Sequence, residues 1–251
     1  MINLKFNKTE VMHLLVVILI LGFVFSFKEW GTEKFDFSYG LLNFLRACLA
    51  IAFALILREL FRKLVAKRFS SGVEYRIWNM RRYGFAKGDH LPKPYLGYII
   101  RELPIGLILA LVLVFISNGN IIFAAVGMFI IQTDYVHRLG NKFKHLTGSE
   151  SAIIALSGPM FNLFLALLFK SIPGFEKFVV VNFLLALYSM IPFSNLDGTK
   201  ILFGSRIIYI FSLIFMIFTY ILSFTIGVVG SIILAFFAAI IIVLIYLYKS
   251  K

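Results

Sequence analysis

Long apolar runs separated by short polar segments limit most strongly what this chain can fold into. A helix needs about 17–25 mostly apolar residues to cross the hydrocarbon core of a bilayer. Seven segments reach or approach that length: residues 11–27, 39–57, 98–116, 151–169, 178–191, 207–224 and 226–248. Hydrophobic residues make up 61% of the chain, whereas a soluble domain has about 45–50%. The sequence therefore predicts an all-α integral membrane protein with six or seven transmembrane helices.

Two apolar segments need a closer reading. The run 11–27 is followed by Lys28, Glu29 and Trp30 instead of a small-residue cleavage site, which indicates a retained span. Residues 121–131 are apolar but too short to cross alone. Such a segment is a half-helix, an extended segment or a re-entrant piece packed inside the protein. The single cysteine, Cys48, has no partner for an internal disulfide.

The positive charge of the chain points to a membrane orientation. Lys and Arg number 25 against 12 Asp and Glu, and the basic residues lie between the apolar runs. Because cytoplasmic loops are enriched in Lys and Arg, we expect residues 58–101 and both termini in the cytoplasm, and residues 28–36 outside. The expected partners are membrane lipids, with no nucleic acid. The basic residues of 58–101 include Arg58, Arg62, Lys63, Lys67, Arg68, Arg76, Arg81, Arg82, Lys87 and Lys93.

Two segments about forty residues apart carry recognisable patterns. Residues 157–163 read Ser-Gly-Pro-Met-Phe-Asn-Leu, and residues 191–198 read Ile-Pro-Phe-Ser-Asn-Leu-Asp-Gly. In this order they resemble the AGPxxN and PxPxLDG motifs of the site-2 protease family of intramembrane zinc metalloproteases. The resemblance implies that Asp197 stands at the position of a third zinc ligand. It implies structural roles for Gly158, Pro159, Asn162, Pro192, Leu196 and Gly198.

A third segment stands where the family has HExxH. Residues 57–68 resemble the HELAHKxVA form of archaeal-type members, but Arg58 and Arg62 replace the two histidines. Imidazole offers a lone pair to zinc, whereas guanidinium has only donors and stays protonated. The resemblance therefore implies a degenerate member in which no zinc is expected. Glu59 stands at the position of the family's general base and is vestigial there. Further matches at residues 7–11, 74–78 and 122–125 extend the resemblance to about Arg206.

The same resemblance suggests how the chain is organised and what it does. We expect one membrane domain over residues 1–251, with a family-like core at about 40–206 and a C-terminal helical hairpin at about 207–248. The family binds transmembrane helices of substrates between its own helices. A pseudoprotease that binds a membrane-protein partner is therefore the leading hypothesis. The alternatives are an active intramembrane zinc metalloendopeptidase with a rebuilt metal site, and a non-enzymatic membrane scaffold or transport component.

Simpler interpretations of the motif residues remain open. Arg58, Glu59 and Arg62 are compatible with an ordinary juxtamembrane ion-pair cluster, since Glu59 and Arg62 have i, i+3 spacing. Asp197 and Gly198 suit a turn. Gly158 and Pro159 suit the start of a helix, and Asn162 suits a hydrogen bond between helices.

Histidine gives no competing metal site. His13, His90, His137 and His145 share no metal-ligand spacing. Residues 137–141, His-Arg-Leu-Gly-Asn, read like a damaged HExGH, but they lack its glutamate and second histidine. Without zinc, the carboxylate of Asp197 needs another cation. We therefore expect Asp197 to form a salt bridge with Arg58 or Arg62, within about 4 Å. Glu59 then pairs with the other arginine or faces the cytoplasm.

Overall fold

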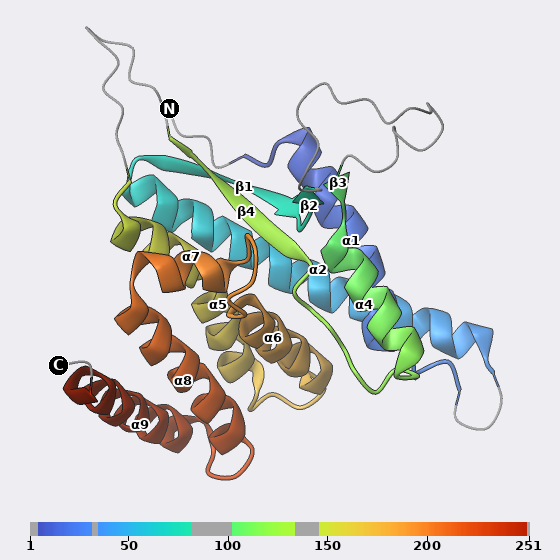
Figure 1. The fold of residues 1–251 in the computed structure, drawn as a ribbon. Coiled ribbons are helices and arrows are strands. Elements are labelled where there is room, and N and C mark those ends of the chain that lie inside the picture. Colours follow the sequence, from blue (N-terminus) through green and yellow to red (C-terminus); the bar gives the residue numbers. More distant parts are fainter. Residues whose placement is uncertain (1–4, 32–34, 82–101, 134–145, 250–251) are drawn as a thin grey trace, which may run out of the picture.

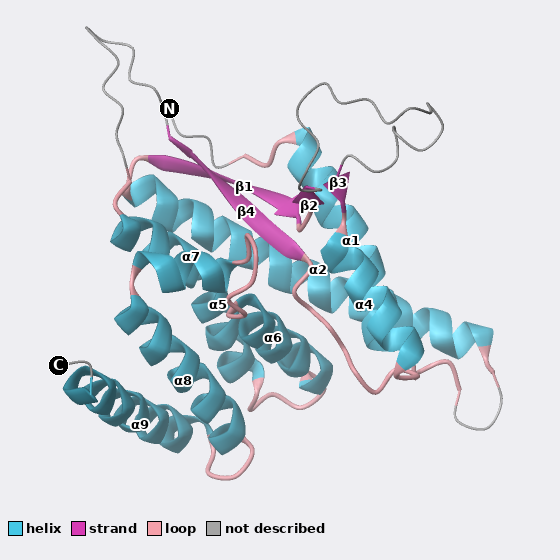
Figure 2. Cartoon of the chain, viewed as in Figure 1, coloured by secondary structure: helices cyan, strands magenta, loops and turns pink. Residues whose placement is uncertain are grey.

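The computed structural model describes residues 5–31, 35–81, 102–133 and 146–249. Helices dominate this part of the chain, and its strands form two small antiparallel sheets, drawn in magenta in Figure 2. The predicted all-α membrane class is confirmed, and the sheets are an addition that the sequence did not predict. In order, the elements are α1 (Lys8–Ser26), α2 (Phe37–Arg68), β1 (Ser71–Ile77), β2 (Met80–Arg81), β3 (Glu102–Leu103), α4 (Ile105–Ile116), β4 (Gly127–Thr133), α5 (Gly148–Phe169), α6 (Glu176–Ser189), α7 (Asp197–Gly204), α8 (Arg206–Ser223) and α9 (Val228–Lys249) (Figure 1).

Five described helices, α1, α2, α5, α8 and α9, are long and apolar enough to cross a membrane. The other two predicted spans are shorter, because α4 has 12 residues and α6 has 14. Helix α4 starts only at Ile105, directly after Pro104, and the two residues before that proline form β3. The predicted count of six or seven is met only when these shorter helices are included.

The helix starts follow local capping chemistry. Asn7 and Glu10 form a capping box at the start of α1, and Thr147 and Glu150 form another at the start of α5. In each box the two side chains satisfy backbone N–H groups that the first helical turn leaves without partners.

The apolar segment 121–131 is extended. Residues 121–126 have no regular structure, and β4 pairs antiparallel with β1 from Ser71↔Thr133 to Ile77↔Gly127. Of the three alternatives for this segment, the extended one is confirmed. The Tyr75 N–H of β1 donates to Glu10 Oε1 of α1 at 3.0 Å, so α1 covers the outer edge of β1 there.

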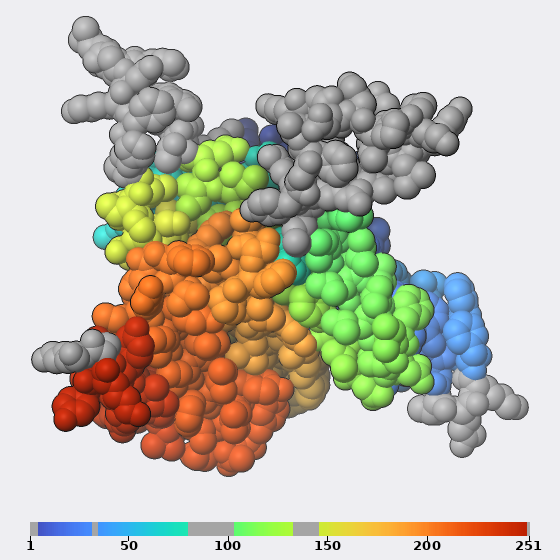
Figure 3. All heavy atoms as spheres, in the orientation of Figure 1, coloured from blue at the N-terminus to red at the C-terminus, as the bar shows by residue number. Residues whose placement is uncertain are grey.

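Helix packing divides the core. One buried cluster joins α1, α2 and α6, and another joins α5, α6 and α8. Helix α9 packs along α8 through Ser231, Ala235 and Ala239, which are fully buried. These two C-terminal helices, orange and red in Figure 3, form the lower left part of the molecule.

Candidate functional site

The C-terminal part of α2 carries a buried ion cluster. The helix has 32 residues, about 48 Å at 1.5 Å per residue, and therefore exceeds the ~30 Å hydrocarbon layer of a bilayer. Its last turns pack against α5 and β1. Within them Arg58 is 5% exposed, Glu59 1% and Arg62 0%. Charged groups so deeply buried require partners.

Asp197 supplies the partner of both arginines. Arg58 Nη2 and Arg62 Nη2 each donate to Asp197 Oδ2 at 2.5 Å. Asp197 is 1% exposed, so the bridged triad is shielded from solvent. The predicted salt bridge from Asp197 to one arginine is confirmed, and it includes the second arginine as well.

Glu59 completes the cluster by pairing with both arginines. Its Oε1 lies 3.1 Å from Arg62 Nη1 and 3.5 Å from Arg58 Nε. Glu59 therefore pairs with arginine inside the protein instead of facing the cytoplasm. The i, i+3 pair of the simpler interpretation is present, but it is buried and joined to Asp197.

Phe129 and Lys200 extend the cluster and were missed by sequence reasoning. Arg62 Cζ lies 4.3 Å and Lys200 Nζ 3.5 Å from the centre of the Phe129 ring. Lys200 also donates to the Phe129 carbonyl oxygen. Burial lowers the pKa of Lys200 to about 8, an effect that nearby Asp197 partly offsets. The i, i+3 spacing from Asp197 to Lys200 was the available signal.

The Gly-Pro segment lies against the arginines. A Cβ at Gly158 would collide with the Arg62 guanidinium and would lie 2.9 Å from Arg58 Nε. Only glycine therefore lets α5 approach the cluster this closely. Pro159 lies inside α5, so the interpretation that it opens a helix is wrong. Asn162 is fully buried, but its amide atoms have no hydrogen-bond partner among the described residues, so the structure shows no interhelical bond.

The Asp-Gly segment begins a helix. Asp197 is the first residue of α7, so the turn-only interpretation is wrong. A Cβ at Gly198 would collide with the Met190 carbonyl group, which explains the glycine. Leu196 is 1% exposed and belongs to a cluster with Trp78, whereas Pro192 is exposed.

The donor set does not fit zinc. Two guanidinium groups and one carboxylate stand where the resemblance expects three ligands, and guanidinium has no lone pair to give. Within the described residues, no three His, Cys, Asp or Glu side chains form a group that could hold a metal. His13 lies on α1, while His90, His145 and residues 137–141 lie outside the described residues.

One relative shares most of the chain. A protein of Methanocaldococcus jannaschii named "putative zinc metalloprotease" is 26% identical over 209 residues, which cover 79% of this chain and 85% of that protein. No family model matches the chain. No solved structure matches it either.

Proposed function

We propose that this chain is a degenerate site-2 protease homologue that binds a transmembrane helix of a partner without cleaving it. The observation that carries the proposal is the bonding of Arg58 and Arg62 to Asp197 at 2.5 Å. These are the three positions at which the resemblance has zinc ligands. An ion-paired triad at these positions supports a site in which the three residues still meet, as zinc ligands would, but do not bind zinc.

The alternatives receive less support. A zinc endopeptidase with a rebuilt metal site agrees with the printed name of the relative, but it requires ligands other than the two guanidinium groups. A scaffold or transport component agrees with the buried charges, since charges inside membrane proteins often mark pathways. The scaffold alternative does not by itself explain why the three motif positions converge on one another.

We further propose a multi-pass arrangement in the cell membrane with both termini cytoplasmic. The turns that follow α4, α5 and α8 lie away from the sheet (Figure 1). On the sheet side, α2 ends at the basic residues Lys67 and Arg68. This separation supports a cytoplasmic location for the sheet side, because Lys and Arg favour that face.

An outward aromatic surface next to the cluster is the best place to look for the partner. Phe61 of α2 stacks on Phe161 of α5, with ring centres 4.6 Å apart, and Phe164 is 54% exposed. Phe161 and Phe164 lie on the same helix as Gly158, where an added Cβ would collide with Arg62. A partner helix at this surface would lie beside the degenerate site.

Photo-crosslinking in native membranes tests both halves of the proposal. A photoreactive residue at Phe164 should yield a discrete protein adduct that contains the partner at full length. The matched control carries the photoreactive residue at Leu244 of α9, which is 59% exposed and should give no such adduct. Shortened partner fragments that vanish in Glu59→Gln would favour the peptidase alternative, and equal adducts at both positions would refute the binding site.

A further inference from the structure

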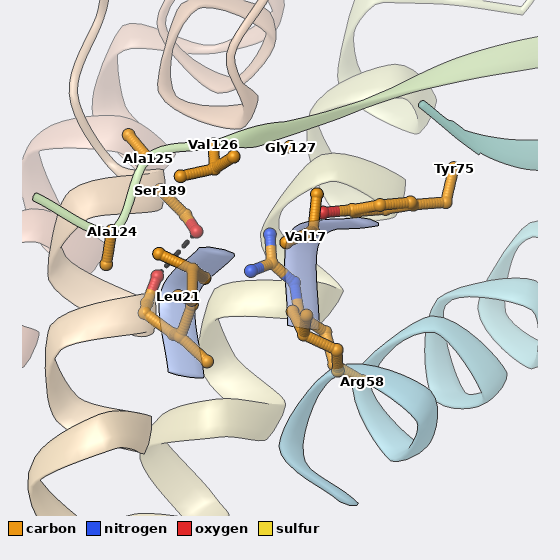
Figure 4. Close-up of a pocket in the computed structure, with 11 residues that line it drawn as sticks. Val17, Leu21, Arg58, Tyr75, Ala124, Ala125, Val126, Gly127 and Ser189 are labelled. Carbon is orange, nitrogen blue, oxygen red and sulfur yellow. Dashed lines mark hydrogen bonds between the residues drawn. The ribbon is translucent and has the colours of Figure 1, made fainter. Parts of the chain in front are cut away.

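A small pocket lies directly beside the ion cluster. It has room for about one water molecule and lies between α1, α2, α6 and the strands. Figure 4 shows Arg58 and Tyr75 extending toward each other from α2 and β1, with Ser189 of α6 across from them. Ser189 Oγ donates its proton to Leu185 O at 2.5 Å, so the Ser189 hydroxyl has no proton left to donate into the pocket. Arg58 and Tyr75 are therefore the two side chains that line the pocket and can donate hydrogen bonds into it.

The local backbone makes space for the tyrosine. A Cβ at Gly127 would collide with the Tyr75 hydroxyl, so glycine at this position lets the phenol reach the pocket. Burial, followed by the charge of Glu59, raises the pKa of Tyr75. The phenol therefore keeps its proton at neutral pH and remains a donor.

The cluster next to the pocket carries more positive than negative groups. Arg58, Arg62 and Lys200 contribute three cations, whereas Glu59 and Asp197 contribute two carboxylates. The nearby Lys63 and Glu10 pair with each other at 2.6 Å and add no net charge. One positive charge is left over in a cluster whose arginines are buried and whose Lys200 is half-buried, and uncompensated charge in a low-dielectric interior is costly.

The Arg58 side chain is the cation of the cluster that reaches the pocket. Its Nη2 bonds to Asp197, but its buried Nε has no hydrogen-bond partner in the described part of the chain and only faces Glu59 at 3.5 Å. An anion beside Arg58 would receive a charge-assisted hydrogen bond. It would also neutralise the surplus charge of the cluster.

We propose that this pocket binds one small monovalent anion of the halide class, held by the guanidinium of Arg58 and the hydroxyl of Tyr75. Chloride is the abundant member of that class. The anion is a structural component of the site, and the proposal does not depend on whether the protein binds or cleaves a partner. A neutral water molecule is the competing occupant, because it fits the same space.

Thermal unfolding in detergent distinguishes a bound anion from a water molecule in the pocket. Sodium chloride is titrated against sodium gluconate at constant ionic strength, and the Tm is followed. Anion binding to the folded state predicts a saturable rise in Tm of a few degrees, because a ligand of the folded state shifts unfolding by mass action. A Tm that is the same in both salts refutes the proposal.

Matched tyrosine variants locate the effect. Tyr75→Phe should abolish the chloride dependence, whatever its effect on the Tm in gluconate. The control Tyr209→Phe removes another buried hydroxyl, which donates to Met190 O at 3.1 Å, and it should keep the full dependence. Chloride dependence that survives in Tyr75→Phe would place the anion elsewhere and contradict the assignment to this pocket.

Discussion

Arg62 and Asp197 are 135 residues apart in the sequence, yet Arg62 Nη2 donates to Asp197 Oδ2 at 2.5 Å. Both side chains are at least 99% buried. The bond joins the end of α2 to the first residue of α7. Because Arg58 shares the same carboxylate oxygen, one acidic side chain holds two helical turns of α2 in place.

Removing Asp197 should therefore weaken the folded protein strongly. Asp197→Ala leaves two buried arginines with Glu59 as their one remaining carboxylate, and breaking a buried pair costs about 3–5 kcal/mol. The Tm in detergent measures the loss.

The control is Asp36→Ala, which removes an exposed carboxylate that caps α2 through the Tyr39 N–H. Loss of a cap costs about 1 kcal/mol. If the two variants melt at the same temperature, the triad contributes little to stability.

Gly158 should tolerate no side chain. Gly158→Ala places a methyl group against the Arg62 guanidinium, and overpacking of this kind costs about 1–3 kcal/mol. Gly72→Ala is the control, since its added Cβ would meet ordinary contacts at 3.7 Å. A stability of Gly158→Ala equal to that of Gly72→Ala would show that α5 adjusts freely around the cluster.

Lys200 should make stability depend on alkaline pH. Its pKa is about 8 in the folded protein and near 10.5 when the chain is unfolded, so the unfolded state binds more protons between these values. Stability should rise with pH through that window, on the order of 2–3 kcal/mol in total, and the cost of burying the charge is fully present below pH 8. Denaturation followed from pH 7 to 10.5 should show this slope in the unmodified protein. A slope unchanged in Lys200→Met would assign it to other groups.

Membrane orientation is open to cysteine labelling. In a Cys48→Ala background, Arg68→Cys should react with an impermeant reagent only from the cytoplasmic side, and Asn118→Cys only from the opposite side. Arg68 ends α2 and Asn118 follows α4, at opposite ends of the helices. Labelling of both positions from one side would overturn the proposed topology.

Much of the fold could be predicted from the lengths of the apolar runs alone. Runs such as 151–169 and 226–248 match α5 and α9 within three residues at each end, because a membrane helix needs an uninterrupted apolar stretch. The apolar run of α2 ends near residue 57, since the following part is polar, and the helical position of Arg58 and Arg62 was predicted from their i, i+4 spacing and the resemblance instead. The polar side chains of Arg58, Glu59, Arg62 and Lys63 are buried by other elements, and the length of an apolar run cannot reveal such burial.

The candidate site could be predicted from the sequence only in part. The i, i+4 spacing of Arg58 and Arg62, combined with the resemblance, predicted their contact with Asp197. Lys200 and Phe129 were not predicted, because Phe129 belongs to a strand that pairs across a long connection. Local periodicity carries no information about such pairing.

Zinc stoichiometry tests the replacement of a metal centre by an ion-paired triad most directly. Purified protein, exposed to excess zinc and then dialysed, is measured by elemental analysis beside Arg58→His/Arg62→His and Asp197→Ala. The unmodified protein should hold well under one zinc per chain, because guanidinium cannot ligate the metal. The double variant should gain zinc, since it places two imidazoles at i, i+4 next to Asp197. One zinc per chain in the unmodified protein, lost in Asp197→Ala, would contradict the replacement.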